Sequence, residues 1–287
     1  MHFLNVGHAY ENVARYTRAV TGEAPDTAVL HAAYREAVSR HRPIAPPREG
    51  TRIHHENSEW GDYLREADVF DGIFKSLRPS TSNEQIAWPG EVTAAVMYVR
   101  DLNPDLCRLV DLLVTDIILL PSDSTGGGSA AHLPGLVALS PGPNWTVFDF
   151  AESLVHESIH LNLFAGDMVH GLYTRPTSEL AADKYRVLSA VKFDQLRPLD
   201  RAFHSAVVAV PLMWMQHQRG ETELVDRFTV SLRDCCQGLN DKRHLFTPYG
   251  KLLVHQLCEF AFSLDWDYVE ESISGQKFST YAVTVPA

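Results

Sequence analysis

The chain has 287 residues and a formal net charge of −11, from 25 lysines and arginines against 36 aspartates and glutamates. With 45% hydrophobic and 21% charged residues, its composition is that of a folded globular protein and excludes a disordered or collagen-like chain. The acidic balance, without a basic cluster, argues against nucleic-acid and anionic-membrane partners. No segment reaches the roughly 18 uncharged apolar residues that a membrane-spanning helix needs.

Cysteine usage and the first residues indicate the compartment. The four cysteines, Cys107, Cys235, Cys236 and Cys258, include no Cys-x-x-Cys pair, which disfavours both a disulfide scaffold and a thiolate zinc site. The N-terminus lacks the basic and apolar segments of a signal peptide. We therefore expect free thiols and a cytoplasmic protein, with the oligomeric state left open.

Apolar spacing predicts a mainly helical α+β protein with a small sheet. Residues spaced by three and four predict helices in the first half at 14–20, 26–38, 60–77 and 91–113, the last interrupted at Asn103-Pro104. Short β-type runs follow at 116–121 and 136–140, then helices at 148–164, 177–191, 199–218, 221–236 and 248–264, and a β-like tail at 276–285. We expect a helical half, 1–114, and a site half, 115–287, or one continuous domain.

Two conspicuous motifs are weak candidates for function. His54-His55-Glu56 is a poor metal site, because adjacent residues on a helix or strand point apart. The Gly126-Gly127-Gly128 triplet lacks the Gly-Lys-Ser/Thr ending of a phosphate loop and does not open a helix. We expect the Gly/Ser segment, 122–131, to be a flexible loop between two strands.

The motif with the clearest chemistry is His156-Glu157-x-x-His160, in the middle of the predicted central helix. Residues four apart lie above one another on a helix, so both imidazoles can bind one metal ion, with Glu157 facing a metal-bound water. Thr146 and Asp149 resemble a capping box at the start of this helix. Two short strands precede it, and zinc peptidases hold an extended substrate along such a strand.

Two histidines are too few for a catalytic metal, and two residues are candidates for the third ligand. Glu179 lies eighteen residues after His160, a spacing that resembles the gluzincin pattern; the alternative is a first-turn glutamate stabilised by the helix dipole. His204 lies on a strongly apolar helix, where a histidine needs a partner. His170 is a weaker option.

Three stretches resemble the HExxH proteins of peptide natural-product clusters, described as iron- and 2-oxoglutarate-dependent β-hydroxylases. They are Leu-Pro-Gly-Leu-Val-Ala-Leu-Ser at 133–140, Leu-Val-His-Glu-Ser-Ile-His at 154–160 and Arg-Pro-Leu-Asp-Arg-Ala-Phe-His at 197–204. The likeness spans about residues 115–220. The sequence departs from the family at Phe203-His204-Ser205, where Leu-His-Gly is usual.

The resemblance implies a zincin-like core around the HExxH helix and Fe(II) held by His156, His160 and a third residue. It also implies 2-oxoglutarate bound to the metal, with its distal carboxylate on an arginine, because guanidinium matches carboxylate geometry. Arg197 is the first choice, then Arg201, with Arg175 behind them. The expected reaction hydroxylates an unactivated C–H bond, β-carbon by preference, of an amino-acid side chain in a peptide or as a free or carrier-bound residue.

The ligand set decides between the competing functions. Two histidines and a carboxylate suit non-haem iron oxygenases and favour Glu179, whereas the family's downstream histidine favours His204. The main alternative is a gluzincin-like zinc peptidase in which Glu157 is the general base; in an oxygenase Glu157 would orient a ligand or the substrate. A third possibility is a binding module derived from such an enzyme.

Overall fold

The computed structural model describes residues 1–274, which form two compact units. The sheet unit is Tyr10–Asn162, and the helical unit combines Met1–Ala9 with residues 163–274. The division expected at residues 114 and 115 falls inside the sheet unit. None of the helices in the described part of the chain has the length and apolar character that a bilayer crossing needs.

Most residues are helical, and the small sheet is mixed. In chain order the elements up to the central helix are α1 (Val6–Thr21), η1 (Thr27–Val29), α2 (Leu30–Ser39), β1 (Arg52–His55), α3 (Glu59–Glu66), α4 (Ser82–Leu102), α5 (Pro104–Leu113), β2 (Asp116–Leu119), β3 (Gly126–Gly128), β4 (Leu136–Ser140) and α6 (Val147–His170). The predicted α+β class is confirmed at this level.

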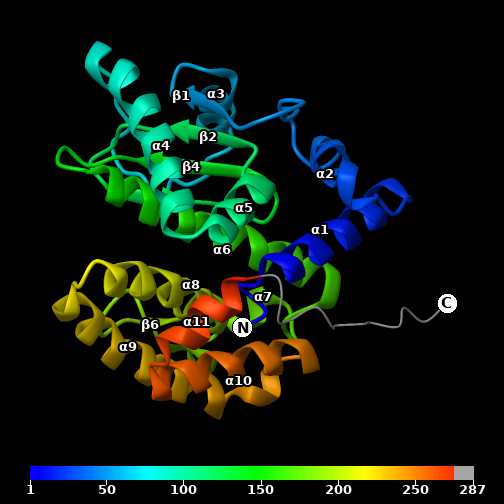
Figure 1. The fold of residues 1–287 in the computed structure, drawn as a ribbon, viewed down its shortest axis with the longest axis vertical. Coiled ribbons are helices and arrows are strands. Elements are labelled where there is room, and N and C mark those ends of the chain that lie inside the picture. The colour runs from blue at the N-terminus through cyan, green and yellow to red at the C-terminus, as the bar shows by residue number, and fades with distance from the viewer. Residues whose placement is uncertain (275–287) are drawn as a thin grey trace. The chain divides into compact units, whose positions relative to one another are not determined.

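The sheet has the strand order β1-β2-β4-β3 (Figure 1). β1, β2 and β4 are parallel, with Ile117 of β2 opposite Ile53 and Val137 on its two neighbours. β3 is antiparallel to β4 and forms one edge. β2 and β4 are buried along their whole length, which explains why they appear in the sequence as continuous apolar runs.

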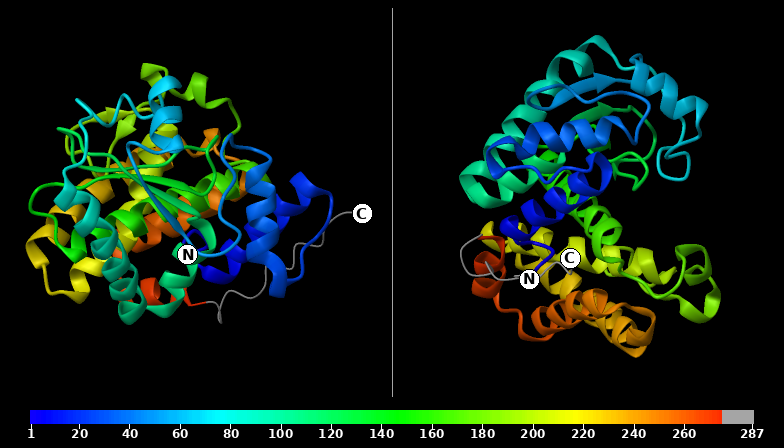
Figure 2. Two further views of the ribbon diagram at one scale, coloured as in Figure 1. Left: turned by 90° about the horizontal axis from the view of Figure 1, so that it is seen from above. Right: turned by 90° about the vertical axis from the view of Figure 1, so that its right-hand side faces the viewer.

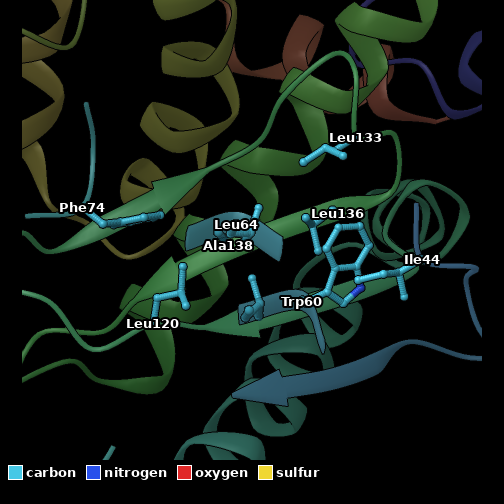
Figure 3. Close-up of a cluster of buried hydrophobic side chains, with 9 residues drawn as sticks. Ile44, Trp60, Leu64, Phe74, Leu120, Leu133, Leu136 and Ala138 are labelled. Carbon is cyan, nitrogen blue, oxygen red and sulfur yellow. The ribbon is translucent and has the colours of Figure 1, made fainter. Parts of the chain in front are cut away.

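One face of the sheet packs against an apolar cluster (Figure 3). Trp60 and Leu64 from α3 meet side chains of β2 and β4, and the cluster as a whole comprises Ile44, Trp60, Leu64, Phe74, Ile118, Leu120, Leu133, Leu136 and Ala138. Because side chains alternate across a strand, Ile117, Leu119, Val137 and Leu139 face the opposite side. That opposite face is the one that bears on the candidate site.

The helical unit is built around α8 (Leu199–Gln218), whose residues are buried on almost every side. The remaining elements of this unit are α7 (Thr177–Leu180), η2 (Asp183–Tyr185), β5 (Val187–Leu188), β6 (Leu196–Arg197), α9 (Thr222–Asp241), η3 (Arg243–Leu245), α10 (Pro248–Ser263) and α11 (Trp266–Ile273). α8, α9, α10 and α11 appear in yellow to red in Figures 1 and 2. β5 and β6 form a short antiparallel hairpin against α9.

Three predicted elements are wrong. The helix expected at 60–77 ends at Glu66, because Asp68 and Phe70 take positive φ angles. The helix expected at 177–191 is a single turn followed by β5, where buried Val187 packs closely on Gly238 of α9. The loop expected at 122–131 contains an ordered strand, β3.

Most of the other predicted helices and strands are found, although their first and last residues differ from the prediction. α4 begins at Ser82, where Thr81 and Glu84 form a capping box, and the break at Asn103-Pro104 is confirmed. α8 has the predicted bounds. β1 was missed, and the β-like segment at 276–285 lies outside the described residues.

Candidate metal centre

The HExxH motif lies in the middle of α6, as predicted. Asp149 accepts hydrogen bonds from the amide and the hydroxyl of Thr146, at 2.6 and 2.7 Å, so half of the expected capping box forms. Phe150, Leu154, Val155 and Ile159 are fully buried and fix which face of the helix turns inward. His156 and His160 occupy a neighbouring, partly exposed face.

The two histidines present their Nε2 atoms to each other at 3.1 Å. Two nitrogens held about 2.1 Å from one ion, at roughly 90–110°, lie about 3.0–3.4 Å apart. The observed distance is compatible with two ligands of a single metal, and it fits an N–H···N hydrogen bond between the two rings equally well. Burial lowers the pKa of His156 to about 4, so this imidazole is neutral near pH 7, the form that binds metals.

Glu157 is buried beside this pair, with Oε1 3.9 Å from Nε2 of His156. Burial raises its pKa to about 7, an effect that the hydrogen bond from Ser129 partly offsets. Ser129 Oγ donates that bond to Oε2 at 2.7 Å. A carboxyl group that changes charge near neutral pH is suited to general acid–base chemistry.

The glycine strand β3 lies directly against Glu157. A Cβ atom on Gly127 would lie 2.6 Å from Glu157 Oε1 and 2.9 Å from its Cγ, so any side chain here would displace the carboxylate. Gly128 faces the other side of the sheet, where a Cβ would lie 3.2 Å from Phe70 and 3.3 Å from Ile73. The triplet predicted to be a loop is therefore an edge strand that leaves room for Glu157.

The candidate third ligands have different surroundings in the helical unit. Glu179 is exposed on α7 and forms an ion pair with Arg175 at 3.0 Å. His204 is partly buried on α8; its ring lies 5.1 Å from that of Phe164, and burial lowers its pKa to about 4. Across residues 1–274, no three His, Cys, Asp or Glu side chains are grouped so that they could hold a metal.

The other predicted residues also lie in the helical unit. Arg197 on β6 is half-buried, and burial lowers its pKa, an effect that the nearby charge of Asp200 partly offsets; within residues 1–274 its side chain forms no hydrogen bond or ion pair. Arg201 is exposed on the first turn of α8. His170 ends α6, with its ring 4.3 Å from that of Tyr249.

His54 and Glu56 have protein partners rather than a shared ligand. His54 Nε2 lies 2.8 Å from Oδ1 of Asp116, and Glu56 accepts hydrogen bonds from the amide and hydroxyl of Ser80. The sequence did not reveal Asp116 as the partner of His54, nor Ser129 as the partner of Glu157. No spacing signal could have found them, because each contact joins residues far apart in the chain.

No protein-family model matches the chain, and no curated protein matches it either.

Proposed function

We propose that this protein is a metal-dependent enzyme, a non-haem Fe(II)- and 2-oxoglutarate-dependent oxygenase that hydroxylates an amino-acid side chain. The observation that carries the proposal is the 3.1 Å separation of the His156 and His160 Nε2 atoms on one face of α6. It fits two adjacent positions on one ion. We also propose, as part of the same hypothesis, that the core around the HExxH helix α6 is zincin-like.

We keep His204 as the proposed third ligand on the sequence resemblance alone, because residues 1–274 contain no group of three metal-binding side chains. Its ring is partly buried among apolar neighbours and neutral near pH 7, which suits an imidazole ligand. Glu179 is the alternative, but its carboxylate is exposed and already bound by Arg175. This contrast favours His204, the third ligand that the hydroxylase resemblance implies, over Glu179, the third ligand of the gluzincin pattern.

Arg197 is proposed to hold the distal carboxylate of 2-oxoglutarate. Its guanidinium is half-buried and forms no hydrogen bond within residues 1–274, and Asp200 is its nearby negative charge, so its N–H groups can form a bidentate bond with a carboxylate. Arg201, on the first turn of α8, is exposed and is the second choice. With Fe(II) and 2-oxoglutarate bound, the site would gain the oxygen-activating chemistry that hydroxylates an unactivated C–H bond.

The edge strand β3 is proposed to position the substrate. No further strand pairs with its outer edge in the four-stranded sheet that the structure describes, so its backbone groups can bind an extended peptide. Its glycines present no side chains to obstruct that approach. We therefore favour a peptide-embedded residue over a free amino acid as substrate.

A second candidate, a zinc peptidase, is favoured by one observation. The pKa of about 7 gives Glu157 the charge state of a general base near neutral pH. In that case Glu157 would take a proton from a water molecule attacking the peptide carbonyl. In the oxygenase the same side chain would instead orient a ligand or the substrate.

The decisive experiment is an anaerobic titration of metal-free protein with Fe(II), then with 2-oxoglutarate, followed by visible absorption. Chelation of the iron by the keto acid is expected to give a weak charge-transfer band. The band should disappear in His156→Ala. If no band forms and the purified protein holds one tight zinc, the oxygenase is excluded, and peptide cleavage dependent on Glu157 becomes the test.

Matched variants then assign the remaining roles. We expect His204→Ala to abolish tight iron binding and Glu179→Ala to leave it unchanged; the reverse result would assign the third ligand to Glu179. Arg197→Gln should keep iron binding and raise the 2-oxoglutarate concentration needed for the band by roughly tenfold or more, as expected for a lost charge-assisted pair. Arg65→Gln, which changes an exposed arginine on α3, is the control variant.

A further inference from the structure

Two of the four cysteines form a contact pair in the helical unit. Cys235 and Cys236 lie on α9 and Cys258 on α10, and all are free thiols. Cys258 Sγ lies 3.7 Å from the carbonyl oxygen of Cys236, and the two thiols share a hydrogen bond. The adjacent Cys235 points elsewhere, since its thiol donates to the carbonyl of Ala202 on α8 at 3.5 Å.

The two members of the pair differ in exposure and charge. Cys258 is partly exposed; the hydrogen bond from Cys236 and the positive charge of Arg243 lower its pKa despite burial. Cys236 is fully buried, and its hydrogen bond to Cys258, together with burial, raises its pKa well above the usual value. The more exposed Cys258 therefore lies against the buried Cys236, an arrangement that suits an attacking and a resolving cysteine.

We propose that Cys258 and Cys236 form an oxidation site, at which a hydroperoxide generates a disulfide between α10 and α9. The Cys258 thiolate attacks one peroxide oxygen, the O–O bond breaks, and hydroxide leaves, which gives a sulfenic acid. The Cys236 sulfur then attacks the Cys258 sulfur, the S–OH bond breaks, and the Cys236 proton leaves with the hydroxyl group as water. In sum, two thiols and one H2O2 give one disulfide and two waters.

The local geometry favours this reaction over the alternatives. Cys258 Sγ already contacts the main chain of Cys236, so the two cysteines occupy directly neighbouring positions on α10 and α9. Cys107 belongs to the sheet unit and is buried on α5. Cys235 is fully buried, and burial raises the pKa of its thiol to about 12, so it contributes almost no thiolate.

The test uses the full-length protein, reduced, freed of reductant and exposed to H2O2. Remaining thiols are then blocked with N-ethylmaleimide and the products are analysed by intact and peptide mass spectrometry. We expect one intramolecular, dithiothreitol-reversible disulfide that joins the tryptic peptide 234–242 to the peptide that contains Cys258. Cys235→Ser, which leaves the pair intact, should give the same product and so distinguish Cys236 from its neighbour.

Two further variants test the roles of the pair. Cys236→Ala should accumulate a sulfenic acid at Cys258, which dimedone traps, without forming a disulfide. Cys258→Ser should slow thiol oxidation by roughly tenfold or more, because the remaining thiols are buried and protonated. Arg243→Gln, which leaves both cysteines in place, should shift the pH dependence of Cys258 alkylation to higher pH.

Three outcomes would overturn the proposal. The first is that peroxide leaves all four thiols of the native protein open to alkylation after unfolding. The second is that the disulfide joins other cysteines, or separate chains. The third is that dimedone labels Cys236 or Cys107 in preference to Cys258. A variant that fails to fold is replaced by the wild-type experiment, in which the identity of the linked peptides decides alone.

Discussion

Asp116 and Glu157 are two buried acids of the same unit with opposite surroundings. Asp116 contacts Arg42, Arg52, His54 and the hydroxyl of Thr115. Burial alone would raise its pKa, but these partners, the His54 hydrogen bond first, lower it below the usual value. Glu157 has the Ser129 hydroxyl as its short hydrogen-bond donor, and burial raises its pKa to about 7.

The difference separates an acid that holds the fold together from one that is available for chemistry. Asp116 is neutralised by two guanidinium groups at the start of β2, and its charge is fixed at any physiological pH. Burial disfavours the charged form of Glu157, and the hydrogen bond from Ser129 offsets this only in part. An acid left in this state costs stability, which is typical of functional sites rather than of structural ones.

The largest effect is expected from Asp116→Asn. Its removal leaves the side chain of Arg42, which is fully buried, without a counter-charge, so we expect a loss of about 3–5 kcal/mol in the free energy of unfolding at pH 7. Because the pKa of Asp116 is lowered by folding, the loss should shrink as the pH falls through the folded-state value. Chemical denaturation at several pH values measures this.

Asp62→Asn is the control for that experiment. Asp62 pairs with Arg65 on the surface, where both side chains are more than half exposed. A surface pair of this kind contributes less than about 1 kcal/mol. Equal losses in the two variants would show that the cluster around Asp116 contributes no more than an exposed ion pair.

Glu157→Gln should raise the free energy of unfolding at neutral pH, whereas Asp116→Asn lowers it. The folded-state pKa of about 7 lies above the unfolded value of 4.5, so the contribution of Glu157 to stability is largest at low pH and is lost as pH rises through 7. Glutamine carries no charge to bury, so the metal-free variant should match the wild type near pH 4.5 and exceed it by up to about 3 kcal/mol near pH 8. Denaturant melts in the presence of a chelator test this.

If the wild type and Glu157→Gln differ in stability by the same amount at every pH, the folded protein does not raise the pKa of Glu157. Adding metal provides a second test of the stability difference between the wild type and Glu157→Gln. A bound cation beside Glu157 stabilises the carboxylate, so the advantage of glutamine at pH 8 should shrink when Zn²⁺ or Fe(II) is present.

The sequence predicts helices and strands best where periodicity alone decides them. α8, β2, β4 and the HExxH helix have unambiguous apolar patterns, and each is found near its predicted position. β3 and β5 were missed, because a run of three glycines and a Val-Leu pair have no strand signal of their own. They become strands through pairing with β4 and β6, which is tertiary information.

The residues of the candidate site likewise fall into those that sequence spacing predicts and those that only tertiary contacts bring together. His156, Glu157 and His160 are close in sequence, and helix geometry alone brings the imidazoles together. Ser129 and Gly127 reach Glu157 only because β3 folds back on β4. Spacing also suggested Glu179, yet its exposure and its bond to Arg175 depend on the single-turn α7.

Gly127→Ala tests the contact between β3 and Glu157. A methyl group 2.6 Å from Oε1 forces the glutamate side chain or the strand to move, and overpacking of this kind costs about 1–3 kcal/mol. Gly128→Ala, which meets only the ring of Phe70 and the tip of Ile73, is the matched control and should cost less. In a Glu157→Ala background the Gly127→Ala cost should nearly vanish; an unchanged cost would place the clash elsewhere.

Ser129→Ala is expected to change the free energy of unfolding least, and in a way that depends on the charge of Glu157. The hydroxyl stabilises the charged form of Glu157, so its loss should raise the pKa of that residue above about 7. The stability cost should be about 1–2 kcal/mol at pH 8, where the carboxylate is charged, and smaller near pH 5, where it is protonated. Ser129→Thr, which keeps the hydroxyl, should restore the wild-type pH profile. A cost that is equal at both pH values would mean that Ser129 supports the strand rather than the charge of Glu157.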